Sequence, residues 1–99
     1  VNWNTRELLT QCLASIEMYP PEAAYEVLVV DNASTDGSAA MVRSRFPQVR
    51  LIENPENVGF AVANNQAIRL SEGQYALLLN SDTEVYPGAL EAMIQFMEG

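Results

Sequence analysis

The sequence predicts an α/β fold, with a mostly parallel sheet flanked by helices on both faces. Short apolar, β-branched runs alternate along the chain with stretches whose apolar residues recur at helical spacing. Turns rich in Asn, Asp, Ser and Gly separate these segments, and 99 residues without a linker or repeat suffice for one small domain. Strands that alternate with helices favour parallel pairing through right-handed crossovers.

Residues 1–4, VNWN, are typical of the end of a strand, so we expect a first strand that is clipped. A helix follows, because Asn4 and Glu7 have the spacing of a capping box and apolar residues then recur on one helical face. Those apolar residues are Leu8, Leu9, Cys12, Leu13 and Ile16. The adjacent prolines Pro20 and Pro21 end this helix.

Residues 26–30, EVLVV, form a nearly continuous apolar run, which is typical of a strand buried on both faces of a parallel sheet. A polar turn occupies residues 31–37. The later elements are a short helix over 38–46, a strand over 49–53, a helix over 59–71, a strand over 75–79, and a final helix that opens at Pro87 and Gly88 and ends at Met97.

The carboxyl ends of these strands are where we expect a ligand. In open α/β sheets, ligands bind outside the carboxyl ends of the strands, near the point where the strand order reverses. In this chain the corresponding segments are residues 2–4, 31–36, 54–59 and 80–84.

The chain is strongly acidic. It has 13 Asp and Glu residues against five Arg and no Lys, which gives a formal net charge of −8. A surface this acidic repels phosphate backbones and anionic lipid, so we expect no nucleic-acid partner. The excess acid either keeps the chain in solution or includes carboxylates that gather around a divalent cation.

Three further observations narrow the chemistry. The chain has no His, which excludes His-based catalysis and His-ligated zinc within these residues. Its one cysteine, Cys12, lies among apolar residues, and we interpret it as a packing residue and not as a reactive thiol. No apolar run approaches the roughly 20 residues that span a bilayer, and no secretory signal pattern is present.

The stretch 29–38, VVDNASTDGS, places Asp31 at the carboxyl end of a buried strand. A carboxylate there can accept hydrogen bonds from the N–H of a base or from a ribose hydroxyl. The alternative is that Asp31 and Asp36 shape the turn and cap the next helix. We favour the structural role for Asp36, because Asp-Gly-Ser before a helix is a strong capping pattern, and leave both roles open for Asp31.

The stretch 77–84, LLLNSDTE, delivers Asn80 and Asp82 on the same side of a strand end, because strand side chains repeat every two residues. Two oxygen-bearing side chains so placed can bind Mg²⁺ or Mn²⁺, with water and substrate phosphates completing the shell. Such an ion neutralises a diphosphate leaving group. Taken alone, Asn-Ser-Asp is also common turn chemistry.

The stretch 57–68, NVGFAVANNQAI, starts a helix near Gly59, whose free N–H groups could face a diphosphate. The positions that we expect in the core are Phe60, Ala63, Ala67 and Ile68. Asn64 and Asn65 are poor mid-helix residues. One of them therefore either contacts a substrate or, as we favour, braces a loop.

Together and in this order, these segments resemble the family-2 glycosyltransferases of the GT-A fold, and most of all the bacterial rhamnosyl- and galactosyltransferases of cell-surface polysaccharides. The pieces that carry the resemblance are VNWN at 1–4, VVDNASTDGS at 29–38, NVGF at 57–60 with Asn64 and Asn65, and LLNSD at 78–82. The resemblance implies the Rossmann-like nucleotide-binding half of that fold. It also implies transfer of a sugar from a UDP- or dTDP-linked donor to a saccharide or lipid-linked acceptor, with inversion.

The resemblance implies roles for single residues in binding the nucleotide. Val1 and Trp3 match the end of the first strand, which lies beside the base. Asp31 matches the acid that contacts the base.

The same resemblance places the metal site at residues 80–82, where Asp82 matches the ligand of Mg²⁺ or Mn²⁺ under the donor diphosphate. The chain departs from the family's Asp-any-Asp motif at its first position, which is Asn80. Because a neutral amide is a poorer cation ligand than a carboxylate, we expect Asn80 and Ser81 to contact the nucleotide, with Asn80 binding the ribose or orienting Asp82.

No residue here matches the family's catalytic base, which the resemblance places well downstream on the acceptor-binding half. We therefore expect residues 1–99 to be one partial domain that binds nucleotide but does not transfer sugar. Exposed sheet edges and apolar helix faces should favour self-association as a dimer. We expect the full-length protein in the cytoplasm, with association at the cytoplasmic face of a membrane as an open alternative.

Other functional classes fit less well or stay open. A signalling receiver domain is disfavoured because the chain has no Lys, and a dinucleotide-dependent oxidoreductase because Gly-x-Gly-x-x-Gly does not follow the first strand. A non-catalytic nucleotide-binding or interaction module of the same fold stays open, because no catalytic residue is identified.

Overall fold

The computed structural model describes residues 1–22, 25–71 and 86–98, and it confirms the α/β class predicted from the sequence. In chain order the elements are α1 (Arg6–Met18), β1 (Leu28–Asp31), α2 (Ser38–Arg45), β2 (Arg50–Glu53), α3 (Phe60–Leu70) and α4 (Ala89–Glu98). The strand expected over residues 75–79 lies outside the described residues.

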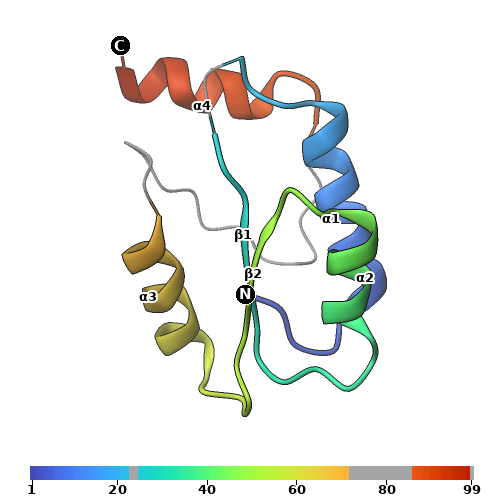
Figure 1. The fold of residues 1–99 in the computed structure, drawn as a ribbon. Coiled ribbons are helices and arrows are strands. Elements are labelled where there is room, and N and C mark those ends of the chain that lie inside the picture. The colour runs from blue at the N-terminus through green and yellow to red at the C-terminus, as the bar shows by residue number, and fades with distance from the viewer. Residues whose placement is uncertain (23–24, 72–85, 99) are drawn as a thin grey trace.

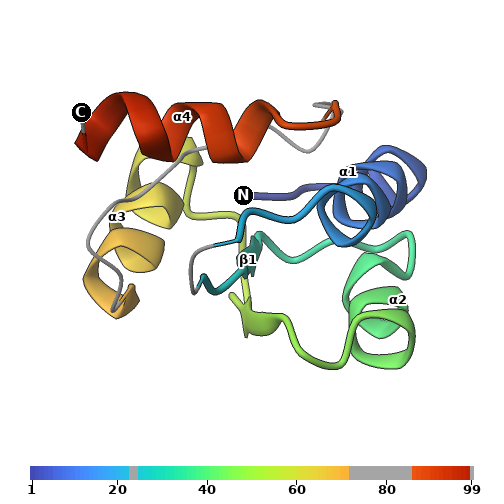
Figure 2. The ribbon, with the colours of Figure 1, turned by 90° about the horizontal axis from the view of Figure 1, so that it is seen from above.

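The sheet lies between two layers of helices (Figures 1 and 2). Helices α1 and α2 pack together on one face, where α2 contacts β2, and α3 packs against β1 on the other face. Helix α4 lies at the end of the molecule where β1 begins (Figure 1), and its Ala89 and Leu90 pack against the core.

Strand β1 lies between two parallel neighbours. On one edge it pairs with β2, with Val30 opposite Ile52. On its other edge the N-terminal segment forms a parallel bridge, in which the N–H of Asn2 donates to the Val30 carbonyl (2.8 Å) and the N–H of Asn32 donates to the Asn2 carbonyl (2.9 Å). The strand-like segment expected at residues 1–4 is therefore confirmed as a neighbour of β1.

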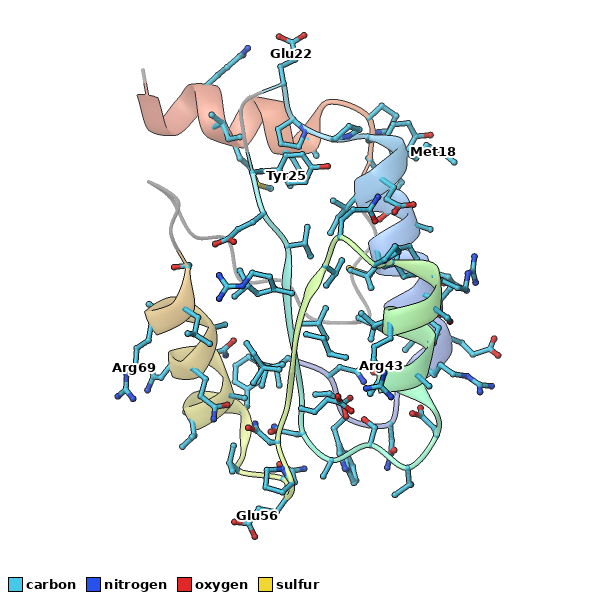
Figure 3. The ribbon with its side chains drawn as sticks, in the orientation of Figure 1. Met18, Glu22, Tyr25, Arg43, Glu56 and Arg69 are labelled. Atoms are coloured by element: carbon cyan, nitrogen blue, oxygen red, sulfur yellow. The ribbon has the colours of Figure 1, made fainter. Side chains whose placement is uncertain are left out.

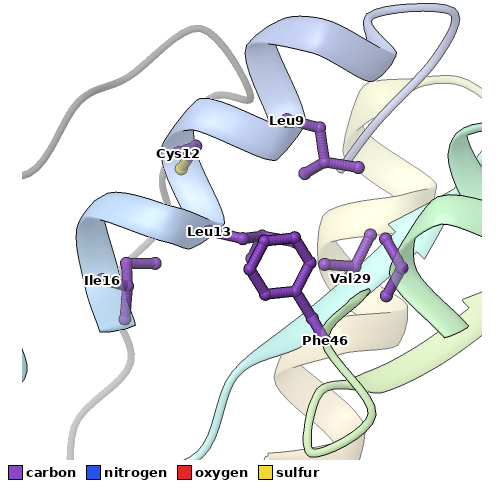
Figure 4. Packing of buried hydrophobic residues seen from close by; sticks show 7 residues of the cluster. Leu9, Cys12, Leu13, Ile16, Val29 and Phe46 are labelled. Carbon is purple, nitrogen blue, oxygen red and sulfur yellow. The ribbon is translucent and has the colours of Figure 1, made fainter. Parts of the chain in front are cut away.

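Apolar side chains fill the space between the sheet and the α1–α2 layer (Figure 4). The cluster consists of Leu9, Cys12, Leu13, Ile16, Val29, Val42 and Phe46. The burial of Cys12 agrees with the packing role expected for it. Val30 follows Val29 and points to the opposite face, where Ala63 of α3 is fully buried. Both helical layers therefore pack against side chains of β1.

Helix α1 does not begin as the capping-box pattern predicted, and the expectation that Asn4 caps it is wrong. The N-cap is Thr5, without a side-chain cap hydrogen bond, and the N–H of Arg6 donates instead to Oδ2 of Asp36 (2.9 Å). Asn4 adopts a left-handed φ of +51° and uses its side-chain oxygen to accept from the N–H of Thr35 (2.8 Å). The cap therefore comes from a loop far away in the sequence.

Helix α3 buries less of its apolar surface than its sequence predicted. Ala63 is buried and Ala67 is half-buried, as expected, but Phe60 and Ile68 are 59% and 46% exposed. Val62 and Leu70 on the same helix are also exposed. The expectation of exposed apolar helix faces holds for α3.

Two glycines allow a test of backbone strain. Gly59 (φ 87°, ψ 165°) lies in a region that essentially only glycine populates, whereas Gly37 (φ 85°, ψ 12°) lies in the left-handed region. A Cβ on Gly59 would meet nothing within 4 Å, so the loss in Gly59→Ala would come from the backbone alone. We expect Gly59→Ala to lower the free energy of unfolding by as much as about 3 kcal/mol and Gly37→Ala by about 1 kcal/mol. Urea unfolding measures both, and equal losses would contradict this assignment.

Candidate functional site

Three loops meet at the carboxyl end of the sheet. They are residues 2–5, 31–37 and 54–59, which contain three of the four segments expected to bind a ligand. Figure 1 shows the loops after β1 and β2 at this end of the molecule, and Glu56 marks it in Figure 3. The sheet therefore brings together polar residues that lie far apart in the sequence.

The remaining expected segment, residues 80–84, lies outside the described residues, and with it Asn80, Ser81 and Asp82. Their expected roles stay predictions.

Asp31 is the centre of the first of two polar networks at this end. The residue is only 3% exposed. Its Oδ1 accepts hydrogen bonds from Nδ2 of Asn2 (2.9 Å) and from the hydroxyl of Ser34 (2.7 Å). Its Oδ2 accepts a hydrogen bond from the backbone N–H of Ser34 (3.0 Å). All of these partners are donors, so the carboxylate acts only as an acceptor. Its Oδ1 accepts two hydrogen bonds and its Oδ2 accepts one.

Asn2 is oriented by its own contacts. Its Oδ1 accepts from the hydroxyl of Thr5 (2.6 Å), and its Nδ2 donates to Asp31 and, more weakly, to the Ser34 hydroxyl (3.3 Å). Turning the amide over would place its oxygen against the Asp31 carboxylate. The residue is 1% exposed. Asn2 belongs to the segment 2–4 that we expected to bind a ligand, but no role of its own was predicted for it, although strand alternation sets it apart from Val1 and Trp3.

The turn after β1 is tied to the N-terminal segment at further points. The hydroxyl of Ser34 accepts from the N–H of Asn4 (2.9 Å), and the side-chain oxygen of Asn4 accepts from the N–H of Thr35. Ala33 in this turn has a left-handed φ of +62°. These contacts hold the turn in one shape beside the first strand.

Asp36 closes this turn and caps two helices. Its Oδ2 accepts from the N–H of Arg6, and its Oδ1 accepts from the N–H (3.0 Å) and the hydroxyl of Ser38. Burial alone would raise the pKa of Asp36, but the hydrogen bonds from Ser38 and Arg6 outweigh it and hold the pKa below its ordinary value. These contacts agree with the structural role that we favoured for Asp36, and they extend it to α1.

Asn32 is the centre of the second network, on the α3 face of the sheet. Its Oδ1 accepts from Nδ2 of Asn54 (3.0 Å), and its Nδ2 donates to the carbonyl of Gly59 (3.3 Å). Asn54 and Gln66 exchange two side-chain hydrogen bonds of 2.9 and 3.1 Å. This amide network joins the ends of β1 and β2 to α3.

The amide network corrects one expectation from the sequence. Bracing of a loop by α3 was favoured for Asn64 or Asn65, but the residue that makes the contact to the loop is Gln66. Asn65 is exposed and Asn64 is half-buried. A helical wheel through Ala63 would have pointed to Gln66, since residues three apart share one face of a helix.

Val1 and Trp3, the expected neighbours of the base, flank Asn2 at this end of the sheet. Val1 is half-buried and Trp3 is 54% exposed. Trp3 is also the single tryptophan of the chain, so its fluorescence can report on this site.

Within residues 1–22, 25–71 and 86–98, no three His, Cys, Asp or Glu residues gather closely enough to hold an ion. No helix in those ranges is both long and apolar enough to cross a bilayer. A surface hollow of about 530 Å³ lies between α1 and α2, lined among others by Thr10, Ala40 and Ser44, and not at Asp31.

Comparison with known proteins agrees with these features. The family model for glycosyl transferase family 2 matches residues 1–99. The poly(ribitol-phosphate) β-glucosyltransferase of Bacillus spizizenii is 32% identical over 93 residues, which cover 89% of this chain and 15% of that protein. The N-acetylglucosaminyl-diphospho-decaprenol L-rhamnosyltransferase of Mycobacterium tuberculosis is 31% identical over 97 residues, covering 87% of this chain and 31% of that protein. The chain thus spans less than a third of the length of either relative.

Solved structures show the same fold. The mannosyltransferase PcManGT from Pyrobaculum calidifontis, in complex with GDP-Man and Mn²⁺, matches with a TM-score of 0.87 and 28% identity, over 99% of this chain and 30% of that chain. TarS from S. aureus (residues 1–349) matches with a TM-score of 0.86 and 25% identity, over 98% of this chain and 30% of that chain. These matches confirm the expected GT-A fold.

The double cap at Asp36 predicts a pH-dependent stability. We expect Asp36→Asn to lower the free energy of unfolding by about 1 kcal/mol at pH 7, because the new NH₂ must face one of the N–H donors of Arg6 or Ser38. Because the folded pKa of Asp36 is lowered, this contribution is fully present above the ordinary pKa of about 3.9 and is lost as the pH falls through the folded value. Urea unfolding of both proteins at pH 7, 5 and 3 tests this, with the exposed Glu56→Gln as a control. A difference that grows on acidification would contradict it.

The amide network predicts unequal effects of neighbouring substitutions on α3. Gln66→Ala removes both hydrogen bonds between Asn54 and this helix. We therefore expect a loss of roughly 1–3 kcal/mol in the free energy of unfolding. Asn65→Ala, at the adjacent exposed position, should be neutral or slightly stabilising because Ala is the better helix former. Thermal and urea unfolding measure both, and equal effects would argue against the brace.

Proposed function

Since this chain belongs to glycosyl transferase family 2, we propose that its strand ends bind the nucleotide of a nucleotide-diphosphate sugar. The whole enzyme would transfer the sugar to an acceptor hydroxyl with inversion at the anomeric carbon. The observation that carries the proposal is Asp31, a carboxylate held at the end of β1 by donors from two segments.

Asp31 is proposed to accept the ring N–H of the base. Among the described residues its Oδ2 receives one hydrogen bond, and a carboxylate oxygen has two acceptor sites. Uracil, thymine and guanine carry a ring N–H, whereas adenine and cytosine in nucleotides do not. We therefore propose a UDP-, dTDP- or GDP-linked donor. The GDP-Man in the related mannosyltransferase supports the wider class.

The other nucleotide contacts are proposed from the same end of the sheet. Val1 and the half-exposed Trp3 would lie against the base or ribose. Asn80 and Ser81, at the end of the next expected strand, would bind the ribose.

A divalent cation is proposed at Asp82, with Mg²⁺ or Mn²⁺ as the ion. The described residues contain no acid cluster that could bind it alone. A single carboxylate with water and diphosphate oxygens is a usual shell for Mg²⁺. When bound, the ion would neutralise the negative charge that develops on the departing diphosphate. The Mn²⁺ in the related mannosyltransferase supports this assignment.

The acceptor is proposed to be a saccharide or a lipid-linked saccharide. One relative's name specifies a diphospho-decaprenol carrier and another's a poly(ribitol-phosphate). A lipid-linked acceptor would place the whole protein at the cytoplasmic face of a membrane. The base that deprotonates the acceptor hydroxyl is not among the residues assigned here.

Calorimetry tests the donor site. We expect UDP, dTDP or GDP with Mn²⁺ to bind the chain and to change the fluorescence of Trp3, with little binding of ADP or CDP. Asp31→Asn should weaken the preferred nucleotide by about tenfold or more, since a hydrogen bond to a charged group contributes about 1.5–3 kcal/mol. Asp82→Ala should remove the dependence on Mn²⁺.

Glu56→Gln is the matched control, because it removes one exposed negative charge at the same end of the sheet without touching either network. Absence of binding at millimolar nucleotide, with the chain folded, would refute the donor-site assignment.

A further inference from the structure

We propose that Asn2 is a positioning residue, which sets the orientation of the Asp31 carboxylate and thereby the discrimination between bases. This inference rests on the proposed function of the same site. It assigns a role to a buried amide that neither the sequence pattern nor the family resemblance singled out.

The two Asp31 oxygens accept different numbers of hydrogen bonds. Asn2 Nδ2 (2.9 Å) and the Ser34 hydroxyl (2.7 Å) both donate to Oδ1. Oδ2 receives the backbone N–H of Ser34 (3.0 Å) and, among the described residues, nothing else. The remaining acceptor site of the carboxylate is therefore on Oδ2, provided that the donors to Oδ1 stay in place.

Asn2 differs from Ser34 in where it comes from. Ser34 belongs to the same turn as Asp31, so a shift of the turn would move both residues together. Asn2 belongs to the neighbouring strand segment and is fixed there by backbone hydrogen bonds to Val30 and Asn32. Among the described residues, only Asn2 donates a hydrogen bond directly to the Asp31 side chain from the segment that also carries Trp3.

The polarity of Asn2 is fixed as well. The Thr5 hydroxyl donates to its Oδ1 (2.6 Å), and the amide is 1% exposed. A flipped amide would set oxygen against oxygen at Asp31. Asn2 therefore presents a donor to Asp31 at all times, and an acidic residue of the same shape would present an acceptor.

An exchange of the two side chains gives a decisive experiment. In Asn2→Asp the donor becomes an acceptor, and in Asp31→Asn one NH₂ must face a donor, either Asn2 or the Ser34 N–H. In the double variant Asn2→Asp/Asp31→Asn, the new amide at 31 can donate to the new acid at 2. Its carbonyl then takes the place of Oδ2.

The probes are UDP, dTDP, GDP, ADP and CDP with Mn²⁺, measured by calorimetry and by Trp3 fluorescence on the folded chain. We expect each single variant to weaken the preferred nucleotide by about tenfold or more and to reduce its preference over ADP. We expect the double variant to regain most of the affinity for the preferred nucleotide and most of the preference over ADP. Gln11→Glu, an amide-to-acid change on the exposed side of α1, is the control and should bind as the unmodified chain does.

The outcomes separate the two proposals. If Asn2→Asp binds with unchanged affinity and selectivity, or if the folded double variant regains neither, the role of Asn2 is overturned while the donor site stands. If the unmodified chain binds no nucleotide, the proposed function fails and the role of Asn2 fails with it. Should Asn2→Asp not fold, Asn2→Ala removes the donor without adding charge, and the same loss of affinity and selectivity is required of it.

Discussion

The rest of the structure depends on how the polar groups at the end of β1 are hydrogen-bonded. The strand is covered on both faces, so the polar groups that terminate it must find partners inside the protein and not in water. Asp31 and Asn32 do so in opposite directions, because neighbouring strand side chains point to opposite faces. Asp31 collects donors from the N-terminal segment and its own turn, whereas Asn32 is held by the loop after β2 and the start of α3. Since an unpaired buried polar group costs about 1–3 kcal/mol, these two residues fix the loops at the carboxyl end of the sheet.

Loops held in this way leave little for a ligand to order. Association loses affinity whenever it must immobilise loops and side chains, and the turn over residues 31–37 is already tied to residues 2, 4 and 6. Asp36 extends the same restraint to the helices, because its two oxygens bind N–H groups at the start of α1 and of α2. Within the described residues, every buried side-chain nitrogen or oxygen atom has a partner. The described part of the candidate site is thus held in place by contacts that also stabilise the fold.

The sequence predicted the elements well, because their signals are local. Apolar residues at helical spacing marked α1, and the run ending in Val30 marked β1. The partners across the sheet were not predicted, because they depend on tertiary structure. Nothing near Asn4 indicates that the cap of α1 comes from Asp36. The unfavourable helix propensity of Asn64 and Asn65 drew attention away from Gln66, whose role depends on where Asn54 lies. The acceptor role of Asp31 could be predicted from its place at a strand end. The hydrogen bond from Asn2 could not, because it depends on the parallel bridge between the two segments.

The partners of Asp31 and Asn32 also explain why an acid precedes an amide. Every described contact of Asp31 is a donor, so an amide there would turn its NH₂ toward one of them. Asn32 donates to the Gly59 carbonyl, which a carboxylate could not do. As long as Asn2 donates to it, position 31 therefore requires an acid, whether or not a nucleotide binds. Because the fold and the candidate site share these atoms, replacing Asp31 affects both the shape of the loop and the binding of a nucleotide. Discrimination between bases can separate the two roles. A distorted loop would weaken the binding of all nucleotides alike. Loss of the acceptor at Oδ2 would weaken the binding only of nucleotides whose base presents a ring N–H to it.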